Sequence, residues 1–212
     1  MPLFRRSLLL TMPGLSLAPT LAPANARADT DPRLAPRGVG DPNAPVSVNE
    51  YFSLTCPHCA RFAKETLPQI HKELIDTGKL YYVYQDFPLD QVALMGAMVA
   101  RTLPPDRYEP FILALLGTQD RWAFARGVNN TDELRKMAVL AGMSPATFDA
   151  TIADTKLRDA ILAQQDVASK QLHVDSTPTF IFNGPSQKDR HASGEMTFDA
   201  FLQVFKEVGG TT

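Results

Sequence analysis

The chain has 212 residues, a formal net charge of −2 and a hydrophobic content of 44%. This charge, with no basic cluster beyond residue 28, argues against nucleic acid as a partner. A chain of this length can bury a core as one domain or as one domain with an insertion.

Residues 1–28 have the features of an export signal. Two arginines precede a mostly apolar stretch, which ends in two small-residue cleavage sites, Ala24-Asn25-Ala26 and Ala26-Arg27-Ala28. A membrane anchor is the less favoured alternative, because three prolines and a glycine interrupt a stretch that would need roughly 20 predominantly apolar residues. We expect cleavage after Ala28 or Ala26 and a location in the periplasm. The arginine pair leaves a twin-arginine export route open.

The next segments predict a leader followed by a strand-helix-strand unit. Residues 29–45 are rich in Pro, Gly, Asp and Arg, which indicates a mobile leader that ends in a turn. The run 46–53 alternates with a period of two and predicts the first strand. A helix is expected over 59–76 with a kink at Pro68, and the β-rich run 80–85 follows. This order implies a parallel crossover.

The pattern between residues 89 and 172 is entirely helical and indicates an inserted helical subdomain, which we expect to govern partner choice. Helix starts are predicted at Asp90, Thr131, Ser144 and Asp154 or Thr155. The segment 117–130, with Trp122 and Phe124, is either a loop beside a groove or part of the core of the insert. We favour the core, because a single tryptophan is usually packed.

Strand character returns near the C-terminus, at residues 178–182. Asn183-Gly184 turns the chain, a weak strand follows, and Thr197 caps a final helix. The order of elements is therefore strand, helix, strand, helical insert, hairpin and helix. We assign the main domain to residues 46–88 and 173–209.

The only two cysteines stand together in the motif Cys56-Pro57-His58-Cys59, between the first predicted strand and its helix. Unpaired N–H groups and the helix dipole favour a thiolate at Cys56. Pro57 suits the first helical position, and a protonated His58 would add positive charge beside the sulfur. A bridge between cysteines so close in sequence constrains little of the unfolded chain. We therefore predict a redox pair with a nucleophilic, exposed Cys56, rather than a structural disulfide.

A metal site is the weaker interpretation of these cysteines. Zinc usually takes four protein ligands, or three and a water, whereas His71, His173 and His191 are scattered along the chain. Haem attachment requires a histidine directly after the second cysteine, and Ala60 stands there. We expect no metal and no cofactor.

Glu50 shares one face of the first predicted strand with three apolar residues, so its carboxylate is expected to point inward. A buried carboxylate without a charge partner has a raised pKa. It could hold a proton and serve as the base for Cys59, through water. The alternative, that local twist turns Glu50 toward solvent, remains open.

The order of elements, the Cys56-Pro57-His58-Cys59 motif and Thr177-Pro178 before a strand together resemble the DsbA-like family of exported thiol-disulfide oxidoreductases, over about residues 40–208. The resemblance implies an α/β thioredoxin fold with a helical insertion. It also implies that Cys56 is the nucleophile, Cys59 its partner in the disulfide and Glu50 the buried acid of the family. Pro178 would be a cis-proline that faces the cysteines, and the backbone of Thr177 would pair with substrate.

The resemblance further implies a disulfide oxidase that acts on reduced exported proteins and is reoxidised by a membrane partner passing electrons to quinone. The Pro-His pair is typical of oxidising members, and a stabilised thiolate makes the disulfide a stronger oxidant. Thr177 stands where some strongly oxidising members have valine, which leaves an isomerase or reductase open. A peptide-binding chaperone is a further alternative. The short leader disfavours a dimeric isomerase, and we expect a monomer.

Overall fold

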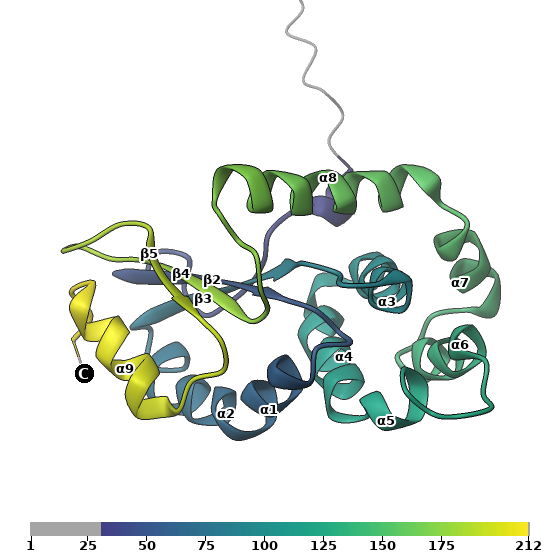
Figure 1. Ribbon diagram of the computed structural model, residues 1–212, viewed down its shortest axis with the longest axis horizontal. Helices are drawn as coiled ribbons and strands as arrows, with labels where there is room; N and C mark the ends of the chain where they lie inside the picture. The colour runs from purple at the N-terminus through teal and green to yellow at the C-terminus, as the bar shows by residue number, and fades with distance from the viewer. Residues whose placement is uncertain (1–30, 212) are drawn as a thin grey trace, which may run out of the picture. The chain divides into compact units, whose positions relative to one another are not determined.

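A computed structural model describes residues 31–211; the predicted export signal lies outside them. One sheet has the strand order β1-β3-β2-β4-β5 (Figure 1). Its strands are β1 (Arg37–Val39), β2 (Val46–Phe52), β3 (Leu80–Asp86), β4 (Thr179–Asn183) and β5 (Arg190–Ser193). β2 and β3 are parallel, as the predicted crossover requires, and the other pairs are antiparallel.

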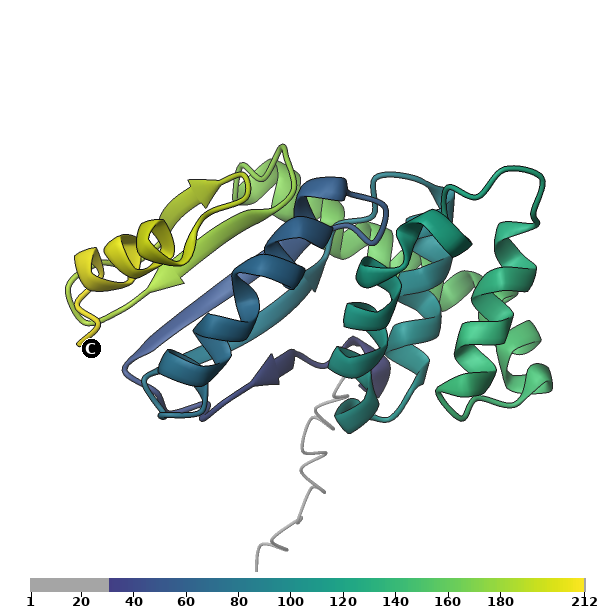
Figure 2. The ribbon, with the colours of Figure 1, turned by 90° about the horizontal axis from the view of Figure 1, so that it is seen from below.

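Helices cover both faces of the sheet. One face packs against α1 (Pro57–Glu65), α2 (Leu67–Ile70), the π-helix η2 (His71–Ile75) and α9 (Phe198–Glu207), and α8 (Thr155–Gln171) crosses the other (Figures 1 and 2). Beside the sheet lie α3 (Gln91–Thr102), α4 (Pro105–Gly117), α5 (Gln119–Trp122), α6 (Asn130–Leu140) and α7 (Pro145–Ile152). The segment between β3 and β4 is thus helical, as predicted. None of the described helices is long and apolar enough to cross a membrane.

Three helices of the insert, α3, α7 and α8, begin at predicted capping residues. The side chains of Asp90, Ser144 and Asp154 accept hydrogen bonds from backbone N–H groups in the first turns of α3, α7 and α8. The predicted start of α6 at Thr131 is wrong, because Asn129 provides the cap and the helix begins at Asn130. Local hydrogen bonding by short polar side chains accounts for this agreement.

The predicted helix over 59–76 is interrupted, and its start agrees with the first helical position indicated by the cysteine motif rather than with residue 59. Pro57 is its first residue, and the segment divides at Thr66 into α1 and α2. Pro68 lies in the first turn of α2, where a missing N–H costs least. The expected kink is therefore present as a break between two helices.

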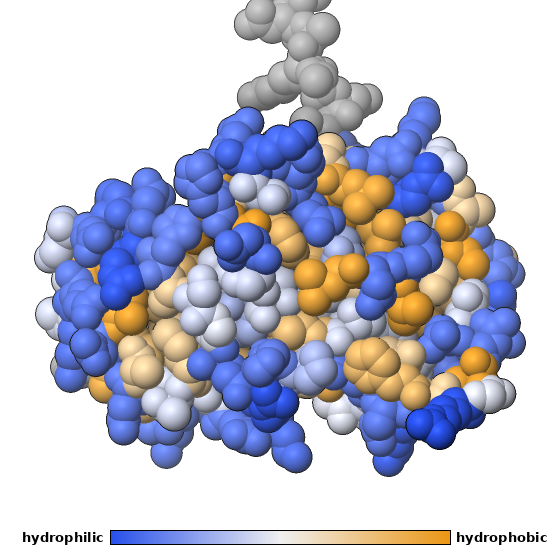
Figure 3. All heavy atoms as spheres, viewed as in Figure 1, coloured by the Kyte–Doolittle hydropathy of each residue, from blue (hydrophilic) through white to orange (hydrophobic). Residues whose placement is uncertain are grey.

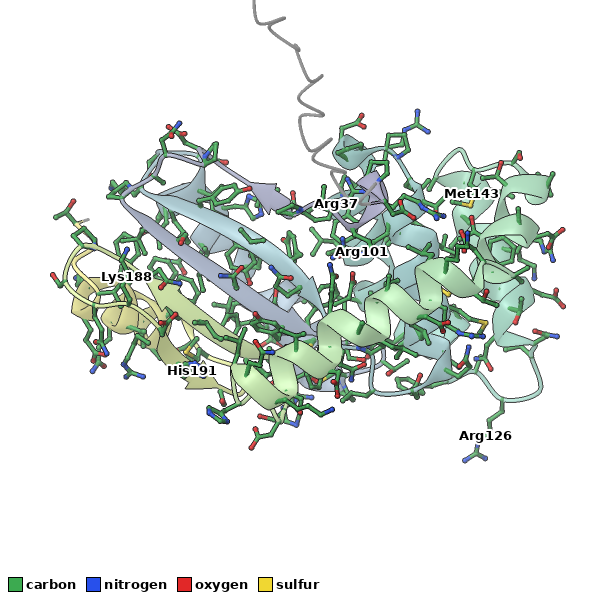
Figure 4. All side chains as sticks on the ribbon, turned by 90° about the horizontal axis from the view of Figure 1, so that it is seen from above. Arg37, Arg101, Arg126, Met143, Lys188 and His191 are labelled. Carbon is green, nitrogen blue, oxygen red and sulfur yellow. The ribbon has the colours of Figure 1, made fainter. Side chains whose placement is uncertain are left out.

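The expectation of a mobile leader over 29–45 is wrong for residues 37–39. They form β1, which pairs with β3 at the sheet edge. The buried guanidinium of Arg37 donates to the carbonyl of Arg101 at 2.9 Å, and Arg101 forms a buried ion pair with Asp86 (Figure 4). Composition predicted a turn-rich leader, but pairing and these tertiary contacts hold the segment as a strand.

The two faces of β2 pack against different helices, as the alternation predicts. Val48, Glu50 and Phe52 are buried on the face that meets α1 and α9. Tyr51 faces the other way and packs with apolar residues around α8, namely Phe87, Ala168, Val174 and Ile181. The sheet therefore places Glu50 in the core beneath the first helix.

The segment around α5 is only partly core. Trp122 is buried, as predicted, and its Nε1 donates to the carbonyl of Leu115 at 2.8 Å. Phe124, which was also expected in the core, is 52% exposed because it follows the end of α5. Apolar side chains are exposed over the insert on the face shown in Figure 3.

Candidate active site

The sheet topology brings two segments that are distant in sequence together at one end of the neighbouring strands β2 and β4. β2 leads into Cys56 at its C-terminal end, and the antiparallel strand β4 begins with Thr179 opposite Tyr51. The Thr177-Pro178 peptide bond is cis, as the resemblance implied. The Sγ of Cys56 lies 3.2 Å from the carbonyl oxygen of Thr177 and donates to it when the thiol is protonated. Residues 121 positions apart in the chain therefore form one site.

Cys56 is the N-cap of α1, with Pro57 at the first helical position. The pKa of Cys56 is lowered to about 5, and the largest cause is a hydrogen bond with the Cys59 side chain. The side chain of Thr177 and the backbone N–H groups of Cys59 and His58 lower the pKa further, whereas burial opposes the shift. The predicted thiolate has its physical basis at the helix start. The expectation of an exposed Cys56 is wrong: the residue is only 4% exposed, because it lies against Thr177 and Cys59.

Cys59 has the opposite character. It is fully buried in the first turn of α1, and burial raises its pKa far above the usual range. Its hydrogen bond to Cys56 raises this pKa further, and so does the negative charge of Glu50 once that carboxyl is ionised. The pair therefore combines a nucleophilic thiolate with a thiol that needs a base before it can react.

Glu50 lies under the pair and is 3% exposed, which confirms its predicted inward orientation. Burial raises its pKa to about 8, although a hydrogen bond from the Tyr82 hydroxyl to Oε2, 2.7 Å long, opposes the shift. Among the described residues Glu50 has no cationic partner. The carboxyl is therefore neutral at pH 7 and can give or take a proton. Tyr82 was not identified from the sequence, although the alternation of β3 places it on the same face of the sheet as Glu50.

His58 is exposed and directed toward two charged side chains. Its Nδ1 lies 2.7 Å from Nη2 of Arg61 and 3.1 Å from Oε2 of Glu195, and Nε of Arg61 donates to the same Oε2 at 2.8 Å. A neutral Nδ1 can accept from Arg61, and a protonated one can donate to Glu195, but one nitrogen cannot do both. Helical spacing could have identified Arg61. Glu195 lies 137 positions away, and no sequence signal pointed to it. A charge on His58 beside the sulfur stays a prediction.

Replacement of Thr177 by valine is expected to stabilise the oxidised protein by about 1 kcal/mol. The Cys56 thiolate that the Thr177 hydroxyl favours is absent from the disulfide form, and this buried hydroxyl has no other hydrogen-bond partner within the described residues. Thr179→Val is a matched control with the opposite sign. Its hydroxyl donates to the carbonyl of Ser176 at 2.8 Å, so its loss should cost about 1–3 kcal/mol. Urea unfolding of both variants checks the prediction, and destabilisation by Thr177→Val would refute it.

The described residues contain no cluster of three or more His, Cys, Asp or Glu side chains that could hold a metal ion. The site is formed by the cysteine motif, the cis-proline and the buried acid, which meet at one end of strands β2 and β4 of a thioredoxin-like sheet. A family model described as Thioredoxin matches residues 34–203. The chain therefore belongs to the thioredoxin family.

Its relatives define the branch of that family. A Rickettsia typhi protein whose name describes it as a protein-disulfide oxidoreductase is 31% identical over 147 residues, which cover 69% of this chain and 54% of the relative. The thiol:disulfide interchange protein DsbA of Salmonella typhimurium is 26% identical over 166 residues, with 76% of each chain covered. The chain spans about half the length of the Rickettsia relatives that it matches.

Solved structures agree with this assignment. The crystal structure of Wolbachia pipientis α-DsbA1 has a TM-score of 0.74 and 28% identity, and the match covers 82% of this chain and 91% of that one. The fold is also that of Chlamydia trachomatis DsbA, with a TM-score of 0.66, 19% identity and coverage of 94% and 97%. The chain is a DsbA-like member of the thioredoxin family.

Proposed function

We propose that this chain is a thiol-disulfide oxidoreductase that introduces disulfide bonds into exported proteins. The observation that carries the proposal is the contrast within the cysteine pair: Cys56 has a pKa of about 5, whereas Cys59 is buried and protonated. A thiolate exists only in the reduced protein, so its stabilisation favours the reduced state and makes the disulfide an oxidant. At pH 7, a fall from an ordinary pKa of 9.0 to about 5 stabilises the reduced state by about 3 kcal/mol, or roughly 60 mV.

The proposed reaction is a two-step exchange. A client thiolate attacks Sγ of Cys56 in the Cys56–Cys59 disulfide, the S–S bond breaks, and Cys59 leaves as a thiolate. Neutral Glu50 supplies the proton that Cys59 then takes, through water. A second client thiolate attacks the client sulfur of the mixed disulfide and displaces Cys56. The client loses two electrons and gains a disulfide, and the protein keeps a dithiol.

Reoxidation needs the reverse proton movement. Cys59 must lose its proton before it can attack, and the Glu50 carboxylate is the base within the site. The electrons pass to a disulfide or quinone-linked partner, which we propose to be a membrane protein of the periplasmic envelope. No resident cofactor takes part in this scheme, and we propose that the protein acts as a monomer.

Client binding in this proposal uses the segment before β4. Thr177 is followed by a cis-proline, and its backbone lies against Cys56. An extended client segment that pairs with this backbone would be held by main-chain hydrogen bonds, hence with little sequence preference. Such binding suits a catalyst with many clients.

The reduction potential of the Cys56–Cys59 pair tests the direction of the reaction. Equilibration with glutathione at pH 7 is expected to give a value near −120 mV, as in strong oxidants of this fold, because the thiolate stabilises the reduced form. The stabilisation of the reduced form should decrease as the pH falls toward 5, where Cys56 becomes protonated. A value near −270 mV, the reduction potential of thioredoxin, would contradict the oxidase proposal and indicate a reductant.

A further inference from the structure

Gln119, the first residue of α5, reaches from the helical insert to the loop that carries Cys56. Its Nε2 donates to the carbonyl oxygens of Leu54 at 2.8 Å and of Cys56 at 3.0 Å. The side chain is buried. Because both partners are carbonyl oxygens, only the amide nitrogen can face them, and the chemistry itself fixes the orientation of the amide.

Gln119 projects from a firmly held segment. Trp122, at the other end of α5, is buried and donates from Nε1 to the carbonyl of Leu115. The side-chain amide of Asn130 donates to the carbonyls of Trp122 at 2.7 Å and Ala123 at 2.8 Å, which ties the end of α5 to the start of α6. A side chain on such a base can hold its partner within a narrow range of positions.

The loop between β2 and α1 depends on these contacts. Leu54 is 2% exposed, and among the described residues no other donor reaches its carbonyl. The carbonyl of Cys56 also accepts from the N–H of Ala60 at 3.1 Å, which is the first hydrogen bond of α1. Gln119 therefore binds the backbone on both sides of Thr55, and one of its two acceptors is also the first acceptor of α1.

Two further contacts from the insert hold the same loop by its side chains. The hydroxyl of Thr55 donates to Asp90 at 2.8 Å, and the hydroxyl oxygen of Ser53 accepts from the N–H of Leu89 at 3.3 Å. Gln119 differs from them because it binds the carbonyl of the reactive residue itself.

We propose that Gln119 is a positioning residue for thiol-disulfide exchange, which holds the backbone of Cys56 so that its sulfur stays aligned with the donors at the start of α1 and thereby sets the oxidising strength of the pair. The inference rests on the proposed exchange at Cys56 and Cys59. It adds a chemical role for the helical insert to the partner choice expected from the sequence.

The direction of the effect follows from the geometry. The thiolate is stabilised first by the Cys59 side chain, and then by the side chain of Thr177 and the N–H groups of Cys59 and His58, all of which depend on where the sulfur lies. Hydrogen bonds weaken steeply as their geometry worsens. A loop released from Gln119 therefore stabilises the thiolate less, and the disulfide becomes a weaker oxidant.

The test compares Gln119→Met with Gln165→Met in the full-length protein. Methionine keeps the length of the side chain but donates no hydrogen bond. Gln165 is a matched control, because its Nε2 donates to a loop carbonyl, that of Pro88, at 3.1 Å, from α8 of the same insert. Both variants are equilibrated with glutathione, and the thiolate of Cys56 is titrated by its ultraviolet absorbance.

Gln119→Met is expected to lower the equilibrium constant for oxidation of glutathione about tenfold, or about 30 mV, and to raise the pKa of Cys56. Gln165→Met should leave both unchanged. Gln119→Glu is a second variant, because an ionised carboxylate cannot donate to the two carbonyls. It should shift the potential in the same direction as Gln119→Met.

A wild-type potential in both Gln119 variants would overturn the inference, even if they unfold at lower urea concentrations, because that result indicates a structural role alone. Equal shifts in Gln119→Met and Gln165→Met would also overturn it. The proposed direction of the reaction is tested separately by the absolute potential of the unaltered protein. A reductant whose potential still falls in Gln119→Met would refute the oxidase proposal and support the role of Gln119.

Discussion

Replacement of Cys59 by alanine is expected to convert the protein into a covalent trap for its clients and to reduce catalytic disulfide formation to the uncatalysed rate. The variant loses the hydrogen bond from the Cys59 side chain, so the pKa of Cys56 rises, but Thr177 and the backbone N–H groups that also lower this pKa remain. Cys56 can therefore still form a mixed disulfide. The internal thiol that would resolve this adduct is absent. Incubation with oxidised or glutathionylated client proteins, followed by non-reducing electrophoresis and mass spectrometry, should reveal adducts at Cys56.

Cys56→Ala is the matched control for the trap. The remaining cysteine is fully buried, and its raised pKa keeps it protonated, so it should form no adduct. Adducts at Cys59 in this control would contradict the assigned roles. Unimpaired catalysis by Cys59→Ala would exclude the exchange mechanism. A binding protein with a structural bridge would form no covalent adduct in either variant.

Glu50→Gln is expected to stabilise the oxidised protein by about 3 kcal/mol at pH 7 and to have almost no effect at pH 4. The ordinary pKa of this carboxyl is 4.5, and burial raises it to about 8 in the folded protein. An acid with a raised folded pKa destabilises the fold increasingly as the pH rises above 4.5, until the cost levels off above 8. Glutamine is neutral in both states, and its Oε1 can still accept from Tyr82.

Urea unfolding at the two pH values measures this effect, with Glu109→Gln as a control of opposite sign. Hydrogen bonds from His71 and Tyr84 outweigh burial and lower the pKa of Glu109, so its charge stabilises the fold at pH 7 and the benefit is lost at low pH. Stabilisation by Glu50→Gln that does not depend on pH would contradict the raised pKa.

Glu50→Gln should also slow the exchange at Cys59 by on the order of 10²-fold, because glutamine can neither give nor take a proton.

The sequence by itself determined the features that depend on neighbouring residues. Short polar side chains predicted the starts of α3, α7 and α8, since a cap bonds to N–H groups two or three positions away. The alternation of β2 predicted the burial of Glu50, because side-chain direction in a strand follows parity. The spacing of the cysteine motif, with proline at the first helical position, predicted a thiolate at the start of α1.

Tertiary structure decided the features that depend on distant segments. β1 is a strand because β3 lies beside it, although its composition predicted a leader. Cys56 is buried because the cis-proline segment covers it, and the contacts of Gln119 with the Cys56 loop and of Glu195 with His58 join residues 63 and 137 positions apart. Periodicity and capping report only on hydrogen bonds and faces within one element. Contacts between elements depend on how the sheet and the insert pack, which no local pattern encodes.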